Sequence, residues 1–340
     1  MRRKQHSEQG RTPPRTTLAG VAQRAGVALD TARRAIQGVP SVRPYLRERV
    51  LRAARELDYR PNLIARALKS QSLRMVTIAA QDFGQLYFAR LVHHLSQKLV
   101  AIGMEPTLCF DNEHTDAVAR EFTTCASILV TGASEDILRR LCERQKVVAI
   151  NAPAKTLPPN AANVTLDFTS AYRHLTRALV VRRRRRVAIC SSHYLRCLEN
   201  GWPRDKMPWV IETLSENGLR PVPPDGMASP DESVFASPAD VAAHLARHPG
   251  SIDAVVCEND LGAATLVAEL STLGLRTPDD VLVVGCDANI PVRGIWTLRI
   301  DESEIADRVV RLLQGLLSDD VPVLAPYRLA LLDENRREID

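Results

Sequence analysis

The sequence lacks the features that would carry the chain into or across a membrane. No apolar run approaches the roughly 20 residues that span a bilayer. The opening "MRRKQHSEQGRTPPRTT" has no apolar stretch of the kind found in a signal peptide. We therefore expect a cytoplasmic protein with no membrane partner.

Cysteine is scarce as well, with seven residues in 340 and no CxxC pair. The odd number and the irregular spacing argue against both a disulfide framework and a zinc site. Several cysteines stand in apolar runs such as "VAIC" and "DAVVC", so we expect reduced, mostly buried thiols. The sequence predicts neither a bound metal nor a cofactor.

The motifs of common enzyme classes are missing too. No GxGxxG follows an apolar run and no GxxxxGK[ST] occurs, which argues against nucleotide sites. The "SSH" at 191–193 is interpreted as lacking the strand–turn–helix setting of a nucleophile elbow. The adjacent His93 and His94 would point in different directions from one helix, which suits surface residues better than metal ligands. The acidic pair at 279–280 is expected to be solvated. We predict that the protein is not an enzyme.

What the sequence does have is an uneven distribution of charge. Residues 1–70 carry 16 Lys and Arg against 5 Asp and Glu, a net charge of +11. The remaining residues carry 29 against 35, a net charge of −6. A basic head on a mildly acidic body is typical of a nucleic-acid-binding head, with a solvated basic tail as the alternative. The length of 340 residues indicates two or three domains.

Residues 16–60 predict three short amphipathic helices that share one small core. Thr17 can cap the first helix, and Gly26 supplies a turn before the second, "ALDTARRAI". A third helix follows in "PYLRERVLRAARELDY". Residues 1–15, polar and with two prolines, are expected to form a disordered basic arm. The predicted core positions are Leu18, Val21, Ala22, Ala25, Ala28, Ala32, Ala35, Ile36, Leu46, Val50, Leu51, Ala54 and Leu57.

Helix, glycine turn and helix form the helix-turn-helix arrangement, whose second helix enters the DNA major groove. Arginine can bond bidentately to guanine, and aspartate can accept from the cytosine amino group. The alternative is an ordinary helix with a solvated face, but no acidic residue follows Arg33 or Arg34 at helical spacing. The predicted DNA-contacting residues of this helix are Leu29, Asp30, Thr31, Arg33, Arg34 and Gln37.

The segment 61–72, "PNLIARALKSQS", is short, basic and rich in small residues. Together with the three helices it resembles the DNA-binding head and hinge helix of the lactose-repressor (LacI/GalR) family, over about 55 residues. The resemblance implies that two hinge helices pair in the minor groove and that Leu68 wedges into a base step, which kinks DNA. Asn62 and Ala65 match the flanking positions, and Thr17 and Tyr59 complete the predicted DNA contacts.

The predicted recognition helix departs from the family at two positions. Ala28 and Arg33 stand where the family usually has serine. The hydroxyls that could bond phosphates are lost, although Arg33 can supply a charged hydrogen bond instead. This change affects which operator is read rather than whether DNA is bound.

From Arg74 on, apolar runs alternate with helical stretches, which predicts βαβ units and parallel sheets. The resemblance implies a two-lobed α/β body like that of periplasmic binding proteins, over residues 73–340. We expect one lobe at about 73–163 with a return segment near 297–325. The other lobe is expected at about 164–296 with the C-terminal segment. The predicted strands are "MVTIAA", "EPTLCF", "SILVTG", "VVAIN", "NVTLD", "RVAICS", "DAVVCE" and "VLVVG".

The run "DAVVCENDLGAATLVAELSTLGLRTPDDVLVVGCD" is similar to a strand–Asn–Asp–helix–strand run of the same family. The resemblance implies that Asn259 and Asp287 contact a small polar effector between the lobes, while Asp260 is expected to cap the helix that begins at Leu261. The family's effector-binding arginine has no match: its position is Leu198 in one alignment and Asp205 in another. Arg196 is the nearby basic residue that we assign to the effector.

A further departure is Ala288, where the family often has a second aspartate. An unusual effector and a pocket that binds nothing both stay open. The five arginines at 182–186 extend a turn that is already basic in the family, so we expect a surface turn, with an anionic partner as the alternative.

Taken together, these patterns predict a sequence-specific transcription regulator, expected to be a repressor. It would bind double-stranded DNA at a pseudo-palindromic operator as a homodimer and respond to a small polar effector, such as a sugar or a sugar derivative. The alternative is an effector-blind DNA-binding regulator with a degenerate pocket. The fold class is an all-α helix-turn-helix head plus hinge helix, joined to a two-lobed α/β body.

Overall fold

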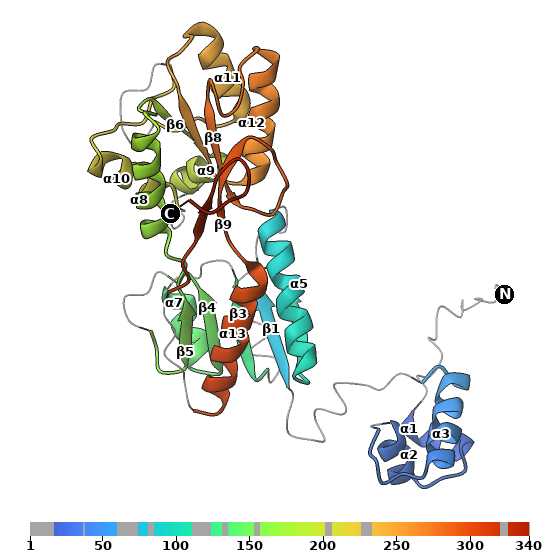
Figure 1. Cartoon of the computed structure of the whole chain (residues 1–340). Coiled ribbons are helices and arrows are strands. Elements are labelled where there is room, and N and C mark those ends of the chain that lie inside the picture. Colours follow the sequence, from blue (N-terminus) through green and yellow to red (C-terminus); the bar gives the residue numbers. More distant parts are fainter. Residues whose placement is uncertain are drawn as a thin grey trace, which may run out of the picture. The chain divides into compact units, whose positions relative to one another are not determined.

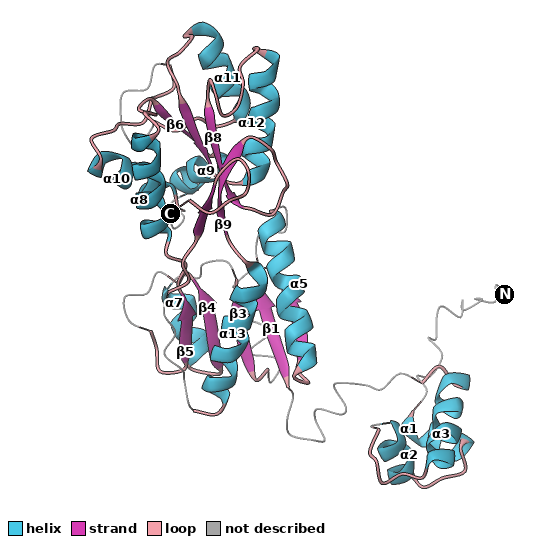
Figure 2. Cartoon of the chain, in the orientation of Figure 1, coloured by secondary structure: helices cyan, strands magenta, loops and turns pink. Residues whose placement is uncertain are grey.

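The computed structural model divides the chain into two units, Met1–Leu73 and Arg74–Asp340, and each is described by itself. Figure 1 labels the elements, and Figure 2 colours them by type. None of the described helices is both long and apolar enough to cross a bilayer. The structure describes residues 17–36, 38–59, 74–80, 85–110, 124–130, 135–152, 157–200, 206–225, 233–319 and 326–339.

The first unit contains the three predicted helices, α1 (Leu18–Arg24), α2 (Leu29–Ile36) and α3 (Pro44–Glu56). None of them is long enough to be stable alone in water, so each depends on the shared core. Ala28 is exposed rather than buried, because it lies one residue before α2 begins, and Ala53 is a core residue that the prediction missed. The buried core consists of Val21, Ala22, Ala25, Ala32, Ala35, Val42, Val50 and Ala53.

The second unit holds two five-stranded sheets, each with helices on both faces (Figure 2). The first sheet is parallel throughout, in the order β2-β1-β3-β4-β5. Its strands are β1 (Met75–Ala79), β2 (Glu105–Cys109), β3 (Ala126–Leu129), β4 (Lys146–Ile150) and β5 (Ala161–Val164).

Alternate residues of the first sheet enter different cores, as the pleat of a strand requires. Ile128 belongs to the core that includes α5 (Leu86–Ala101) and α13 (Glu302–Leu317). Its neighbour Leu129 belongs to the core of the opposite face, under α7 (Glu135–Cys142). Both faces of the central strands β1, β3 and β4 are therefore buried, which is why these three strands appear as continuous apolar runs in the sequence.

The second sheet has the order β10-β9-β8-β7-β6, and β10 alone is antiparallel to its neighbour. One face packs against α8 and α10, and the other against α11 and α12. The strands are β6 (Val187–Cys190), β7 (Ala254–Cys257), β8 (Leu282–Asp287), β9 (Ile295–Arg299) and β10 (Ala330–Leu332). The helices are α8 (Phe168–Val181), α9 (Ser192–Asn200), α10 (Met207–Glu216), α11 (Pro238–Arg247) and α12 (Asp260–Thr272).

All eight predicted strands are present in the predicted order, while β9 and β10 were not predicted. The return to the first lobe differs in detail from the expected segment at 297–325. The structure places β9 in the second sheet, and α13 is the element that packs against α5, β4 and β5 of the first. The two-sheet α/β fold predicted for the body is confirmed.

Candidate DNA-binding surface and effector site

The turn between α1 and α2 fixes how the second helix stands on the first. Thr17 caps α1 as predicted, since its Oγ1 accepts from the amide of Gly20 at 3.2 Å. At the other end, the amide of Val27 donates to the carbonyl of Ala22 at 3.0 Å, a six-residue helix closure. Gly26 in this turn has a φ of +60°, which only glycine adopts without strain. The glycine is required by the backbone and not by a ligand.

The arginines of α3 and α1 hold the head together. Arg47 donates to the carbonyl of Val39 at 2.7 Å, and Arg49 donates to the carbonyl of Gly26 at 3.0 Å. Arg24 pairs with Glu56 at 3.0 Å between α1 and α3. Several positively charged side chains of the head therefore bind its own loops and helix ends. The net charge of the head overstates the charge that is available to bind DNA.

The face of α2 away from the core carries the predicted DNA-reading residues. Leu29 is exposed although it is a large apolar residue, with 44% of its surface accessible. Arg34 keeps 57% of its side chain accessible, and Arg33 31%. Thr31 is half-buried. An exposed leucine beside arginines is the kind of surface that can contact both thymine methyl groups and guanine edges.

A single carboxylate joins the two arginines of α2. Asp30 Oδ1 accepts from Arg33 at 3.2 Å, and Asp30 Oδ2 lies 2.9 Å from Arg34 Nε. The acidic partner lies three and four residues before the arginines, on the side opposite to the C-terminal positions from which a partner was expected. Such exposed pairs contribute little to stability, but they restrict where a guanidinium points.

Four other predicted DNA contacts lie outside the described residues, namely Gln37, Asn62, Ala65 and Leu68. Tyr59 is described and is half-buried against the core of the head. Its amide donates to the carbonyl of Ala54 at 2.8 Å, closing the end of α3.

In the second unit, the predicted effector residue Asp287 ends β8 and is 6% exposed. Lys206 Nζ lies 3.9 Å from its Oδ1, and the lysine side chain is itself only 12% exposed. Asp287 and Ala288 both have positive φ, 95° and 56°. Two successive non-glycine residues in this region are strained, and such strain gathers at binding sites.

Residues of the first lobe reach the same place. The pKa of Tyr87 on α5 is raised, first by burial and then by the charges of Asp287 and Glu302. Among the described residues the Tyr87 hydroxyl has no hydrogen-bond partner. Glu302 at the start of α13 is 5% exposed and lies 3.4 Å from Arg90 of α5. Burial is the main cause of its raised pKa. The structure thus brings buried polar groups from both lobes together around Asp287.

Asn259, and not Asp260, is the residue that caps α12. Asn259 caps α12, because its Oδ1 accepts from the amide of Gly262 at 2.8 Å. Asp260 is the first residue of the helix, completely buried, and accepts from the Thr297 hydroxyl at 2.6 Å. A Cβ on Gly285 would come within 2.3 Å of Asp260 Oδ1, so glycine makes the room for this carboxylate. The prediction that Asp260 caps the helix was wrong.

The pKa of Asp260 is raised to about 6, first by burial and then by the charge of Asp287, while the Thr297 hydrogen bond and Arg336 oppose the shift. This carboxylate is therefore half-protonated near pH 6, about two pH units above the point for an ordinary aspartate.

Lys206 is the residue that the sequence argument missed. Arg196 was selected as the nearest basic residue, and it lies on α9 with an exposed side chain. Leu198, one candidate position for the family's arginine, is partly buried against the core, and Asp205 lies outside the described residues. In the sequence, Lys206 is a single lysine directly before α10, and no motif distinguishes it from surface lysines.

Ser191 lies between β6 and α9, and His193 is the second residue of α9, so the segment does have a strand–turn–helix context, contrary to the sequence interpretation. Their contacts nevertheless differ from those of a nucleophile and its base. Ser191 Oγ donates to Glu258 at 2.7 Å, and the His193 ring contacts the Cys197 sulfur at 3.4 Å. The turn ties β6 to the residue before Asn259 and so supports the end of β7.

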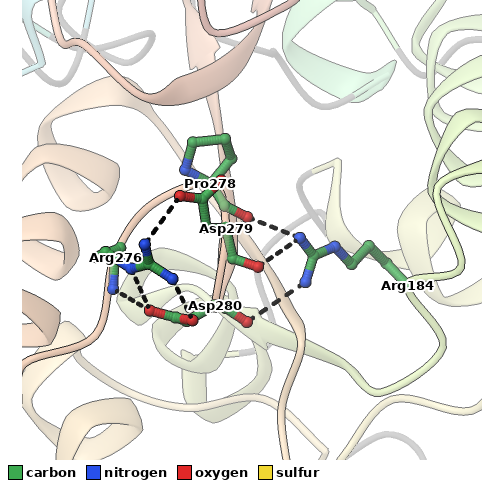
Figure 3. A network of polar contacts seen from close by, with 5 residues as sticks. All are labelled: Arg184, Arg276, Pro278, Asp279 and Asp280. Carbon is green, nitrogen blue, oxygen red and sulfur yellow. Dashed lines mark hydrogen bonds and ion pairs between the residues drawn. The ribbon is translucent and has the colours of Figure 1, made fainter.

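Two arginines of the run at 182–186, Arg184 and Arg186, bind the protein itself. Arg184 donates to the carbonyls of Pro278, Asp279 and Asp280, at 2.7, 2.9 and 3.3 Å (Figure 3). Arg186 pairs with Asp253 at 3.2 Å. In the same network Arg276 binds Asp280 at 3.1 Å, so this carboxylate is paired, and its pKa is lowered by that hydrogen bond.

Each of the two units matches a known protein family. Residues 17–62 match the bacterial regulatory proteins of the lacI family, and residues 176–331 match the periplasmic binding protein-like domain. Together the two matches cover more than half of the chain. The chain belongs to the lacI family of bacterial regulatory proteins. It is thus a DNA-binding transcription regulator with a periplasmic-binding-protein-like body.

Curated relatives and solved structures are similar to this chain over most of their length. Catabolite control protein A of Staphylococcus aureus (strain N315) is 21% identical over 278 residues, covering 79% of this chain and 81% of that protein. The sucrose operon repressor of Escherichia coli is 26% identical over 280 residues, covering 80% and 83%. The Lac repressor dimer bound to operator and the anti-inducer ONPF superposes with a TM-score of 0.70 at 18% identity, covering 95% of this chain and 98% of that one.

Proposed function

We propose that this lacI-family regulator represses transcription by binding a pseudo-palindromic operator as a homodimer in the cytoplasm. The observation that carries the proposal is the three-helix head, whose α2 turns Leu29 and Arg34 away from the core. The similar sucrose operon repressor is a repressor by name, and the Lac repressor structure is a dimer on its operator. Two heads related by a two-fold axis would read two half-sites.

Each exposed residue of α2 has a separate role in this proposal. Arg34 reads a base edge, because its guanidinium is accessible and Asp30 holds it. Arg33 neutralises a phosphate, which gives affinity without sequence preference. Residues 61–72, with Asn62, Ala65 and Leu68, supply the minor-groove contacts, and the Leu68 wedge bends the DNA.

For the body we propose that a small polar molecule, a sugar or a sugar derivative, binds at Asp287. The carboxylate can accept from hydroxyl groups, and Lys206 beside it can donate to them. Solved structures with similar folds contain such ligands: one is the CelR–cellobiose complex, with a TM-score of 0.59 at 21% identity, covering 94% of this chain and 98% of that one. Effector binding would alter operator affinity through the lobes, by a coupling of about 1 to 3 kcal/mol.

A second candidate function is an effector-blind regulator, and one observation favours it. Polar groups of this region already have partners within the protein, since Lys206 lies by Asp287 and the Asn259 oxygen caps α12. A catalytic role is not proposed, because Ser191 is bonded to Glu258 instead of to a histidine.

The test of the main proposal is operator selection from random double-stranded DNA with the full chain. A pseudo-palindromic consensus bound by a dimer supports the proposal. Selection of asymmetric or unrelated sequences would contradict it.

A thermal-shift screen of sugars, sugar phosphates, nucleosides and polyols then separates the two candidates, because a ligand of the native state raises the melting temperature. A ligand whose shift is lost in Asp287→Ala, while operator affinity stays, supports the effector site. A flat screen and operator affinity unaffected by any of these compounds would support the effector-blind regulator.

A further inference from the structure

Three metal-ligating side chains meet at the C-terminal end of α11, in the second lobe. His244 lies in the last turn of this helix, His248 follows its last residue, and Asp225 comes from the segment after α10. His244 Nδ1 is 3.0 Å and His248 Nε2 is 3.2 Å from the same atom, Asp225 Oδ1. One ligand atom from each residue lies within 4.8 Å of the others.

These separations match the spacing of ligand atoms around a small cation. Zinc holds its nitrogen and oxygen ligands at about 2.0–2.2 Å, so neighbouring ligand atoms in a tetrahedral site are about 3.3 Å apart. Two histidines four residues apart at one face of a helix are a recurrent zinc-binding pair. The third ligand lies 19 residues before His244 in the sequence, which is why the chain shows no metal motif.

His244 supplies an independent observation that points to a ligand. The residue is only 6% exposed, and neither ring nitrogen has a hydrogen-bond partner among the described residues. Its Nδ1 lies 3.0 Å from Asp225 Oδ1. This distance is short enough for a hydrogen bond, but the orientation of the two groups does not form one. A buried polar atom without a partner is costly. A cation bound between this nitrogen and the carboxylate oxygen would give the nitrogen a partner.

The surroundings also suit a structural ion. Arg247 binds the other carboxylate oxygen, Oδ2, and leaves Oδ1 to the two histidines. Phe235 packs its ring edge-on against the His244 imidazole, with centroids 5.4 Å apart, and limits the access of water from that side. Outer partners of this kind hold a metal ligand in its binding orientation.

We propose that Asp225, His244 and His248 form a binding site for a divalent transition-metal ion, with zinc as the best-fitting ion and water as the fourth ligand. Nitrogen and carboxylate ligands without a thiolate suit Zn²⁺ and Co²⁺ better than Ca²⁺ or Mg²⁺. The ion would join the segment before residue 226 to α11 and so stabilise the second lobe.

The test is calorimetric titration of the full chain, free of any affinity tag and stripped with a chelator, with Zn²⁺. His248→Ala is the main variant, because the His248 side chain is half exposed and its removal leaves the core intact. Asp225→Asn removes the shared ligand oxygen charge. His93→Ala is the matched control, since His93 is an exposed helical histidine next to another histidine. Melting without zinc verifies that each variant folds.

We expect one zinc ion per chain, an affinity at least tenfold lower in His248→Ala and in Asp225→Asn, and no change in His93→Ala. Co²⁺ should give the visible absorption of a tetrahedral site without a thiolate charge-transfer band. Less than half an equivalent of zinc, equal affinity in wild type and His248→Ala, or a thiolate band from the cysteines would each overturn the proposal.

Discussion

The two units use the same pair of residue types, arginine and aspartate, in opposite ways. On α2, Asp30 joins Arg33 and Arg34 at the surface, where Asp30 and Arg34 are largely accessible and Arg33 is partly accessible. In the body, Arg184 gives its donors to three backbone carbonyls, and Arg186 pairs with Asp253, which is 8% exposed. Charge density in a sequence therefore does not locate a nucleic-acid surface. What matters is whether the guanidinium groups still have donors to offer.

The difference has a simple structural origin. The acidic partner of Arg33 and Arg34 is Asp30 in the first turn of the same helix, so these arginines pair locally on the face of α2 away from the core. The turn after α8 lies beside the segment 276–280, whose carbonyls accept from Arg184 (Figure 3). Partners about 95 residues away in the sequence come within hydrogen-bond distance only in the folded body.

The strongest test of the contrast between the arginines of α2 and those of the body is Arg34→Ala. We expect operator affinity to fall by about 1 to 3 kcal/mol and the preference at one operator position to relax, because a base-reading guanidinium is lost. Arg33→Ala should weaken binding to all sequences alike. Operator selection and binding isotherms at fixed salt measure both effects.

The matched control for this prediction is Arg184→Ala, which removes an arginine from the denser cluster. Its operator affinity and base preferences should equal those of wild type. Unchanged base preferences in Arg34→Ala, or a loss of DNA binding in Arg184→Ala, would reverse the assignment of the two regions.

A second prediction contrasts the buried Asp260 with the exposed carboxylates. Its pKa of about 6 in the folded chain lies above the usual value of 3.8. The folded state therefore binds the proton more tightly, and the associated stability is present at low pH and lost as pH rises through 6. Asp260→Asn cannot titrate, so the free energy of unfolding of this variant minus that of wild type should rise by about 2 kcal/mol from pH 4.5 to pH 7.

Urea unfolding at several pH values measures this difference. Asp280→Asn is the control with the opposite sign, because hydrogen bonds from Arg276 lower the pKa of Asp280. The contribution of Asp280 is present at neutral pH and is lost as pH falls below its usual pKa. A pH-independent difference for Asp260→Asn would mean that this carboxylate is not shifted.

Much of this architecture was predictable because local pattern and final structure agree. Six of the eight predicted strands are almost fully buried and appear in the sequence as apolar runs, since helices cover both faces of each sheet. The edge strands β2 and β5 are partly exposed. Strand β10 escaped prediction because a three-residue antiparallel edge leaves too little pattern. In the head, the helices were predicted, but Ala28 was placed in the core because periodicity does not define the first residue of a helix.

The polar sites were less predictable, because they depend on contacts between distant segments. The prediction of Asp287 rested on a family resemblance, whereas Lys206 beside it had no signal of its own. Asn259 and Asp260 are adjacent, and the side chain of either residue type can cap a helix, so local sequence does not decide between them. The choice was decided by Thr297 and Gly285, which take up Asp260 in the interior.

A third prediction concerns Arg184 itself. Arg184→Ala leaves the carbonyls of Pro278 and Asp279 without their charged donor, so the body should lose about 1 to 2 kcal/mol of stability. For a body of this size the melting temperature should fall by about 2–4 °C for each kcal/mol. Arg183→Ala, one residue earlier and exposed, should melt like wild type. Equal melting of the two variants would show that the network is only a surface contact.

The smallest expected effect belongs to Asp30, and it separates positioning from stability. Asp30→Ala removes one carboxylate from an exposed i,i+3 and i,i+4 cluster, so the head should lose no more than about 0.5 kcal/mol. Glu56→Ala is the matched control, because Glu56 forms an exposed pair of the same head with Arg24, away from α2. Both variants lose one negative charge, so both should bind nonspecific DNA slightly better, with equal salt dependence. Only Asp30→Ala frees the Arg34 guanidinium, so only this variant should broaden the base preference that Arg34 sets. Operator selection with the two variants side by side measures the difference. If the two selected consensus sequences are identical, Asp30 stabilises the helix surface and does not position Arg34.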